Sequence, residues 1–512
     1  MRITLIHPPI CINPRAIQAT RPSLPLGLAY LAAALREAGH DVSVLDALQA
    51  RPDQVTGEGP LAYHGLRPEE IAEAVPEEAE LVGVSVLFSF TWPMVRRIVH
   101  AVRARRPDVL LVGGGEHFAG LPEQSLRQAP LDYVIAGEGE AAACALVDAL
   151  EQGGAPDNVE GVAFLRGGAF VETPRRARIR DLDALPWPAW DLFDVRAYYE
   201  QGHVLGVDTG MTMPILATRG CPYACTFCSS AAMWGRQWLA RTPERVVDEI
   251  EAYHTRYGAR NFPFHDLTAV LRKDWVVRFC EGLRARGLEV TWQLPSGTRC
   301  EVIDAETAEL MRGAGCASIT FAAESGSERT RRLVGKRLDE ASLMRAVRAA
   351  IQAGMNVSCF FVVGFPHDTR TDLNASVRLA IRLARVGVND IALSAFFPIP
   401  NTPLFNELLS SGRLEISDET LLAPIFSMNA AIPARYNYCE YLSAGAVTWM
   451  KYKILLAFYA TSFVVRPWRG FEILLNVLRG RETCKMDIFL NGVKRRVLRR
   501  LGFGGTRRRA AA

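Results

Sequence analysis

Three cysteines are spaced as ligands of a single metal centre. Cys221, Cys225 and Cys228 stand in TRGCPYACTFCSS, in the pattern CxxxCxxC. Thiolates are soft ligands that suit iron–sulfur clusters, and three of them leave one iron of a four-iron cubane without a protein ligand. The spacing therefore predicts a [4Fe-4S] cluster with one open iron. The alternatives are a zinc site, which normally takes a fourth Cys or His nearby, and three buried structural thiols.

The elements that would position these cysteines alternate between strands and helices. The expected strands are 214–218, 261–265, 289–293, 318–323, 356–363 and 390–396. The expected helices between them are 243–257, 273–286, 305–313, 340–353 and 372–386. Six such units predict a partial (β/α)6 barrel, with its site at the carboxyl ends of the strands. The cysteines directly follow the first of these strands, which is where that site is expected.

The first part of the chain has the same alternation in a different arrangement. Its expected strands are 2–7, 41–48, 81–87, 109–113 and 133–136, and its expected helices include 27–38, 92–104 and 141–150. This order predicts a doubly wound, Rossmann-like parallel sheet, which binds ligands beyond the carboxyl ends of its strands. Those ends carry GGGEH at 113–117 and GEGE at 137–140. These glycines indicate either close approach of a nucleotide-like or tetrapyrrole ligand or simply tight turns.

Two further segments differ from both α/β regions. Residues 155–194 contain a hairpin-like GVAFLRGGAFVET and the Pro-rich LPWPAWDLFD, which indicate a linker that packs through Trp187 and Trp190. The C-terminal region is predicted to be mainly helical. It could lie on an anionic membrane surface, bind an acidic substrate, or present a solvated face over a helix that caps the barrel. Its basic side chains are Arg466, Arg469, Arg479, Arg481, Lys494, Arg495, Arg496, Arg499 and Arg500, interleaved with Trp468, Phe471, Leu474, Leu475 and Leu478.

Composition limits the classes of protein. The 512 residues suggest two substantial domains with an appendage, and 49% hydrophobic with 22% charged residues favours a globular chain. A net charge of +4 gives no support for nucleic-acid binding. MRITLIHPPI lacks the features of a signal peptide, and the apolar run 454–465 is shorter than the roughly 20 residues that span a bilayer. Eleven irregularly spaced cysteines fit a reducing cytoplasm.

The cysteine loop and the strands after it resemble the radical S-adenosylmethionine superfamily. The resemblance rests on TRGCPYACTFCSS with Phe227 before the last cysteine, on TPERVVDEIEAYHTRYGARNFPFHD, and on ITFAAESGSE, FFVVGFP and SAFFPIPNTPLF in that order. It implies an enzyme whose open cluster iron chelates the methionine moiety of S-adenosylmethionine and cleaves it reductively to a 5′-deoxyadenosyl radical. It also implies a small-molecule substrate and an electron donor such as flavodoxin or ferredoxin.

The same resemblance assigns contacts with S-adenosylmethionine. Glu324 and Ser325 are expected to contact the ribose and the methionine, although Glu324 could instead pair with a barrel arginine such as Arg299. Phe227 and Gly364 are expected to border the adenine, or to serve in core packing. Asp266 is expected near the methionine moiety or substrate. The neighbouring His265 replaces the acidic residue that is commoner in the superfamily, and a lone histidine is more often structural.

The N-terminal part resembles the cobalamin-binding domain found ahead of many such barrels. RPSLPLGLAYLAAALREAGHDVSVLDA and GGGEHFAGLPEQSLRQAPLDYVIAGEGE carry this likeness. It implies cobalamin contacts at Gly114, Gly115, His117, Gly137 and Glu138. No DxHxxG motif follows any strand, so cobalamin is expected base-off without a histidine ligand. His117 is then expected near the edge of the ring or its nucleotide tail, or as a turn residue that caps the next helix.

These inferences combine into one prediction of organisation and function. The expected domains are a cobalamin-binding domain at 1–152, a linker at 153–205, the radical barrel at 206–408 and a helical extension at 409–512. The favoured reaction is C-methylation of an unactivated carbon in a natural-product, lipid or tetrapyrrole substrate. The alternatives are radical oxidative cyclisation or rearrangement without methyl transfer, and a non-catalytic cobalamin- or metal-sensing module.

Overall fold

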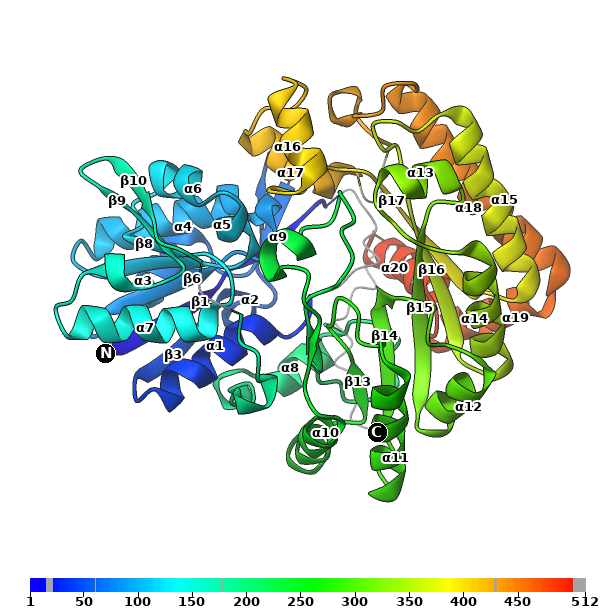
Figure 1. The fold of residues 1–512 in the computed structure, drawn as a ribbon, viewed down its shortest axis with the longest axis horizontal. Coiled ribbons are helices and arrows are strands. Elements are labelled where there is room, and N and C mark those ends of the chain that lie inside the picture. The colour runs from blue at the N-terminus through cyan, green and yellow to red at the C-terminus, as the bar shows by residue number, and fades with distance from the viewer. Residues whose placement is uncertain (15–21, 60, 176–177, 428–430, 501–512) are drawn as a thin grey trace.

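The computed structural model describes residues 1–14, 22–59, 61–175, 178–427 and 431–500. The first sheet has seven strands in the order β10-β9-β8-β7-β6-β1-β3 (Figure 1). Five of them run parallel, and β9 and β10 form an antiparallel hairpin at one edge. The bounds are β1 Arg2–His7, β3 Asp41–Asp46, β6 Leu81–Ser85, β7 Leu110–Gly114, β8 Tyr133–Ile135, β9 Val162–Arg166 and β10 Ala169–Glu172.

Helices cover both faces of this sheet, as the sequence predicts. α1 (Leu26–Glu37) and α7 (Gly139–Glu151) share one buried apolar cluster with one face of the strands, whereas α4 (Trp92–Arg105) and α3 (Pro68–Ala74) belong to the cluster on the other face. The hairpin β9–β10 falls inside the expected linker 153–205. Because β9 pairs with β8, the hairpin is part of the first sheet, and that sheet extends beyond residue 152.

A small antiparallel sheet lies beside the first one and is absent from the sequence prediction. It has the order β2-β5-β4, with β2 Ile10–Ile12, β5 Leu61–His64 and β4 Val55–Glu58. Each strand has only three or four residues. Such short segments carry too little of the alternating pattern to be recognised.

The second sheet is the parallel sheet of the partial barrel, in the order β13-β14-β15-β16-β17. The predicted strand at 214–218 is only partly correct. Thr212 and Ile215 each form one parallel bridge to the segment of β13, but no regular strand forms. The N–H groups of Met213 and Ile215 donate to Asn261 O and Pro263 O on either side of Pro214, whereas Pro263 has no N–H to donate to Met213 O, which explains the interruption. The bounds are β13 Asn261–Pro263, β14 Thr291–Thr298, β15 Cys316–Glu324, β16 Asn356–Val363 and β17 Asp390–Ala395.

Three of the described helices outside this sheet, α12, α14 and α15, begin at side chains that cap them. Asp304 accepts a hydrogen bond from Thr307 N, and Asp339 accepts one from Ser342 N. Thr369 and Asp372 form a reciprocal capping box. These helices carry their apolar residues on the face toward the strands. The bounds are α10 Pro243–Tyr257, α11 Lys273–Ala285, α12 Ala305–Gly313, α14 Glu340–Gln352 and α15 Arg370–Val386.

The C-terminal region is helical, as expected. α18 packs along α15 on the outside of the barrel, and α19 and α20 follow it (Figure 1). α17 contacts the N-terminal domain, where Asp418 pairs with Arg96 at 2.7 Å. None of the described helices is both long and apolar enough to cross a bilayer. The bounds are α16 Pro403–Ser410, α17 Asp418–Ser427, α18 Ala444–Val465, α19 Trp468–Arg479 and α20 Lys485–Arg500.

Candidate active site

The cysteine loop runs between two short elements that set its position. It follows β11 (Thr218–Arg219), which pairs antiparallel with β12 (Leu239–Ala240), and it leads into α9 (Ser230–Trp234). Thr226 anchors the loop, because its N–H donates to Val334 O at 2.9 Å and its carbonyl accepts from Leu404 N at 3.0 Å. The loop is thus held between the segment after β15 and the start of α16.

The three thiols are arranged for a centre larger than one zinc ion. Cys221, Cys225 and Cys228 are all half-buried. In the described part of the chain, at least two of their three sulfur atoms lie more than 4.8 Å apart. Tetrahedral zinc with bonds of about 2.3 Å would need sulfur atoms about 3.8 Å apart. The geometry therefore favours an iron–sulfur cubane over a mononuclear zinc site.

Glu324 stands beside this loop in an unusual backbone conformation. It ends β15 at φ +59, and the β15–β16 register shifts there, which turns its side chain out of the regular pleat. Its carboxylate accepts from Lys336 Nζ at 3.1 Å, and both side chains are nearly buried. Both charges also act on the thiol of Cys225. The Glu324 carboxylate is therefore close to the cysteine loop, and its partner is Lys336 instead of Arg299.

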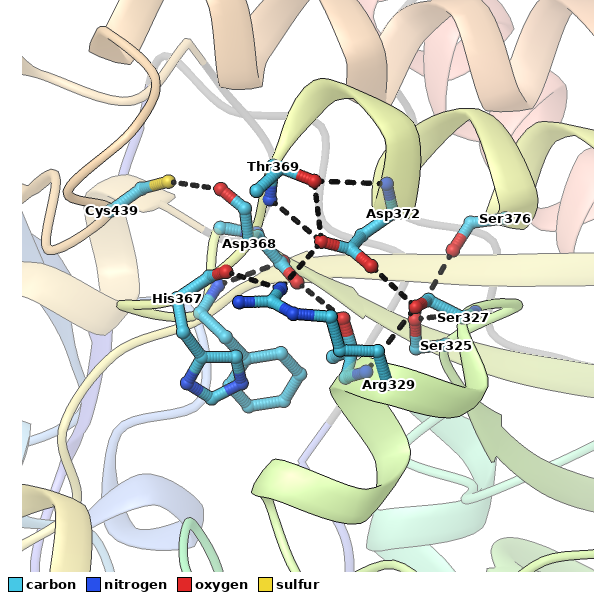
Figure 2. Close-up of polar contacts among 12 residues, drawn as sticks. Ser325, Ser327, Arg329, His367, Asp368, Thr369, Asp372, Ser376 and Cys439 are labelled. Carbon is cyan, nitrogen blue, oxygen red and sulfur yellow. Dashed lines mark hydrogen bonds and ion pairs between the residues drawn. The ribbon is translucent and has the colours of Figure 1, made fainter.

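Ser325 belongs to a hydrogen-bonded network at the start of α15 (Figure 2). Its hydroxyl accepts from Ser327 N at 3.1 Å and lies 3.4 Å from the hydroxyl of Ser376. Ser327 in turn donates to Asp372 at 2.5 Å. The network fixes the turn after β15. Ser325 is 2% exposed, and its hydroxyl is already hydrogen-bonded to protein. The predicted contact with S-adenosylmethionine through this hydroxyl is therefore not supported.

Phe227 and Gly364 lie at the predicted adenine border, but protein atoms account for part of their surroundings. Phe227 packs against Phe365 with ring centroids 5.3 Å apart. Gly364 has φ +80, and a Cβ there would come within 2.9 Å of Val447 in α18. Its backbone N–H donates to Asp368, whose pKa burial raises to about 6. The need for glycine at 364 is thus explained by packing of α18, whatever else contacts it.

Asp266 is held by the chain segment that leads into the cysteine loop. It is 3% exposed and accepts hydrogen bonds from Ala217 N and from both N and Oγ1 of Thr218. Burial raises its pKa to about 6 against these donors. Its carboxylate therefore fixes Ala217 and Thr218 just before the loop, and its contact with the methionine moiety or substrate stays a prediction.

Several buried polar atoms near the cysteine loop have no protein partner. They come from the loop itself or from the carboxyl ends of β13 and β14, and buried polar groups are normally hydrogen-bonded. They are therefore suited to a polar ligand. Arg299 is notable among them, because its guanidinium stacks on Tyr223 at 3.8 Å and its Nη1 has no acceptor. The atoms are Thr226 Oγ1, Ser230 Oγ, His265 Nε2, Thr268 Oγ1, Thr298 Oγ1 and Arg299 Nη1.

The glycines at the edge of the first sheet divide into two kinds. A Cβ on Gly115 would lie 2.6 Å from Val86 O, so that glycine is required by packing. A Cβ on Gly114 or Gly137 would meet no atom within 4 Å. These two positions leave open space beside the backbone at adjacent strand ends. They are the positions among the predicted cobalamin contacts that suit close approach of a large ligand.

His117 does not face that open space. It is 1% exposed, its ring stacks on Trp92, and its nitrogens lie 3.0 Å from Ser89 Oγ and 3.3 Å from Ser125 Oγ. Burial lowers its pKa to about 3, so the ring is neutral. The His117 side chain thus packs in the core beneath α5 (Glu116–Gly120) and α6 (Pro122–Gln128), and its contact with cobalamin stays a prediction.

Glu138 is also committed to protein contacts, and these join the two domains. Arg219, two residues before Cys221, donates to Glu140 at 2.5 Å and to Glu138 at 3.3 Å. Glu138 also accepts from Arg178 Nε at 3.0 Å. The carboxylates of GEGE therefore bind the base of the cysteine loop, and a cofactor contact of Glu138 stays a prediction. Nothing local in the sequence marks Arg219, Glu140 or Lys336, because the partner of each charge is distant in sequence.

Comparison with known families identifies both halves of the chain. A family model described as B12 binding domain matches residues 15–147, and one described as Radical SAM superfamily matches residues 215–380. The chain is 30% identical over 420 residues to an uncharacterized methyltransferase of Pyrococcus horikoshii, covering 81% of this chain and 84% of the relative. It is also 30% identical to the anaerobic magnesium-protoporphyrin IX monomethyl ester cyclase of Cereibacter sphaeroides, covering 84% and 67%.

Solved structures share the fold. The radical S-adenosylmethionine methyltransferase TsrM from Kitasatospora setae aligns with a TM-score of 0.64 at 20% identity, over 80% of this chain and 76% of that chain. The cobalamin-dependent radical enzyme OxsB aligns with a TM-score of 0.68 at 14% identity, over 98% and 80%. With both family models matched in order and a relative matched over most of its length, the chain belongs to the radical S-adenosylmethionine enzymes that carry a B12-binding domain, and its cofactors are a [4Fe-4S] cluster, S-adenosylmethionine and cobalamin.

Proposed function

We propose that this enzyme methylates an unactivated carbon of a small-molecule substrate. In this proposal Cys221, Cys225 and Cys228 hold the cluster, and Glu324 contacts S-adenosylmethionine. Gly114 and Gly137 lie against cobalamin. An electron donor such as flavodoxin or ferredoxin reduces the cluster. The substrate would be a natural product, a lipid or a tetrapyrrole.

The observation that carries the proposal is the contact between the two candidate cofactor edges. α5 directly follows the Gly-rich turn of the first domain, α9 directly follows the last cysteine, and the two helices pack together. Burial raises the pKa of Glu116 of α5 while the Ser229 side chain of the cysteine loop acts to lower it, and the Glu116 charge acts to raise the pKa of Cys228. Methyl transfer by a radical route needs both cofactors to reach one substrate carbon. The contact between α5 and α9 supports a single site that both cofactors reach.

The residues of this chain supply binding, orientation and exclusion of water. When bound, the cluster supplies the electron that cleaves S-adenosylmethionine, and cobalamin carries the methyl group. The buried pair Glu324–Lys336 presents a carboxylate beside the cysteine loop that can accept from ribose hydroxyls. Arg299 Nη1, a buried donor without a protein acceptor, suits the carboxylate of the methionine moiety. Phe227 and Phe365 form an apolar wall that limits access of water.

Radical oxidative cyclisation without methyl transfer is the second candidate. It is favoured by the 30% identity to the Cereibacter sphaeroides cyclase, a relative matched over 84% of this chain. Both reactions need the same cysteines and the same S-adenosylmethionine contacts. They differ in what becomes of the methyl group, so the products of S-adenosylmethionine distinguish them.

The test is to quantify S-adenosylhomocysteine and 5′-deoxyadenosine made by the reconstituted, cobalamin-loaded enzyme with candidate substrates. Methyl transfer produces both compounds, and S-adenosylmethionine with a deuterated methyl group labels the product. Cyclisation produces 5′-deoxyadenosine alone. A protein that retains cluster and cobalamin but produces neither compound under reducing conditions would contradict an enzymatic role and favour the sensing module.

A further inference from the structure

The C-terminal helices expose apolar side chains that the fold leaves uncovered. α18 carries apolar residues on both its inner and its outer face, with Lys451 and Lys453 as its charged residues, and a helix that is apolar on opposite faces is normally buried. Its inner face is buried against the barrel through Val447, Ile454 and Phe458. On its outer face Trp449 is 64% exposed and Leu456 68%. No described segment of the chain covers that outer face.

α19 continues this exposed apolar surface, and it does not have the orientation expected of a helix that caps a barrel. Such a helix would turn its apolar residues inward and its basic residues to solvent. Here Phe471 is 70% exposed and Leu478 65%, with Leu474 and Leu475 also exposed. Arg469, by contrast, is buried and donates to Ser462, and Arg466 donates to Gly387 O at 2.7 Å. The arrangement argues against a merely solvated outer face.

The same region holds the basic excess of the chain. Residues 466–512 contain thirteen Arg and Lys and three Asp and Glu, a net charge of +10 against +4 for the whole chain. The remainder is therefore net acidic. Exposed Arg479, Arg481 and Arg495 border the apolar residues of α19 and α20. Trp449 and Tyr452 of α18 and Trp468 at the start of α19 are also exposed, and such amphipathic rings favour the boundary between lipid and water.

We propose that the outer face of α18 and α19 docks on the surface of an anionic lipid bilayer. The apolar side chains would enter the headgroup boundary while the arginines contact lipid phosphates, which is how peripheral amphipathic helices bind membranes. A second copy of this chain is disfavoured as the occupant, because pairing two such faces would oppose their positive charges. α18 and α19 lie on the outer side of the barrel, away from the N-terminal domain (Figure 1). Docking there leaves the contact between the two domains free.

The proposal is tested with the full-length protein and extruded vesicles. Phosphatidylcholine vesicles are compared with an equal mixture of phosphatidylcholine and phosphatidylglycerol in a sedimentation assay. The test variant is F471S/L478S, and the control is Val55→Ser, an apolar residue of similar exposure, 55%, on β4 in the N-terminal domain. We expect binding to the anionic vesicles that weakens as salt is raised, and a loss of about tenfold or more in F471S/L478S.

The control variant should bind as the parent does, and all three proteins should unfold at the same temperature, because the exchanged side chains are exposed. Three results would overturn the proposal. They are equal binding to neutral and anionic vesicles, unchanged binding of F471S/L478S, and a dimer in light scattering that F471S/L478S converts to a monomer. The last result would assign the face to a second copy of the chain.

Discussion

Replacing Arg219 by methionine should destabilise the junction between the two domains while leaving the three cysteines intact. The Arg219 guanidinium is 4% exposed and contacts Glu140 and Glu138, which are 9% and 6% exposed. Glu138 keeps Arg178 as a partner, whereas no other cation pairs with Glu140 within the described part of the chain. Removing one member of a buried pair costs about 3–5 kcal/mol, because the remaining charge stays desolvated.

The contribution of the Glu140 carboxyl to the pH dependence of folding stability should also change in sign. Burial acts to raise the pKa of Glu140, but the charge and hydrogen bonds of Arg219 hold it below its ordinary value. In the parent protein this pair therefore contributes stability that is lost as pH falls through the lowered pKa. In the methionine variant burial, the largest influence on the pKa of Glu140, is opposed only by a backbone hydrogen bond. We therefore expect its folded-state pKa to lie above the unfolded one, so that stability is gained as pH falls toward it.

The measurement is urea unfolding at neutral and mildly acidic pH, with iron content of the reconstituted protein as a second readout. The control is Arg278→Met, which removes an ion pair with Glu244 in which both side chains are more than half exposed. That variant should lose no more than about 1 kcal/mol. Arg219→Lys should recover part of the loss. If Arg219→Met and Arg278→Met lose equally little, the buried pair does not hold the domains together.

Three further outcomes are expected. Cys228→Ala should abolish the cluster, measured as bound iron, whereas Cys359→Ala in β16 should not; full iron in the Cys228 variant would remove it from the ligand set. Glu324→Ala should keep the cluster and weaken S-adenosylmethionine binding by roughly tenfold or more, and an unchanged Kd would make Glu324 structural. Because burial lowers the pKa of His117 to about 3, lowering the pH to about 5 should cost the folded state about 2 kcal/mol through this ring. His117→Gln should show a correspondingly smaller loss in urea unfolding, and an equal loss would contradict that account.

The repeating elements could be predicted because their signals are local. The helices 243–257 and 305–313 and the strand 356–363 occur with the predicted bounds, since apolar spacing and capping residues lie within each segment. The strand at 214–218 could be predicted only in part. Pro263 of the neighbouring strand lacks the N–H that would continue the ladder, and the Asp266 carboxylate accepts from Ala217 N and Thr218 N instead. The hairpin at 162–172 was recognised locally, but its membership of the first sheet depends on pairing with β8.

The sequence by itself determined the chemistry of the cluster loop, because three thiols at CxxxCxxC are identified by residue type and spacing alone. Only the tertiary structure decided which charged groups meet. The segment GEGE at 137–140 indicates a ligand-binding turn, yet its Glu138 and Glu140 pair with Arg219, which is 79 residues away from Glu140 in the chain. His117 reads as a cofactor residue, yet it is buried against Trp92. Spacing reports neighbours within a turn or strand, whereas the burial and partner of a polar side chain depend on which distant surfaces pack against it.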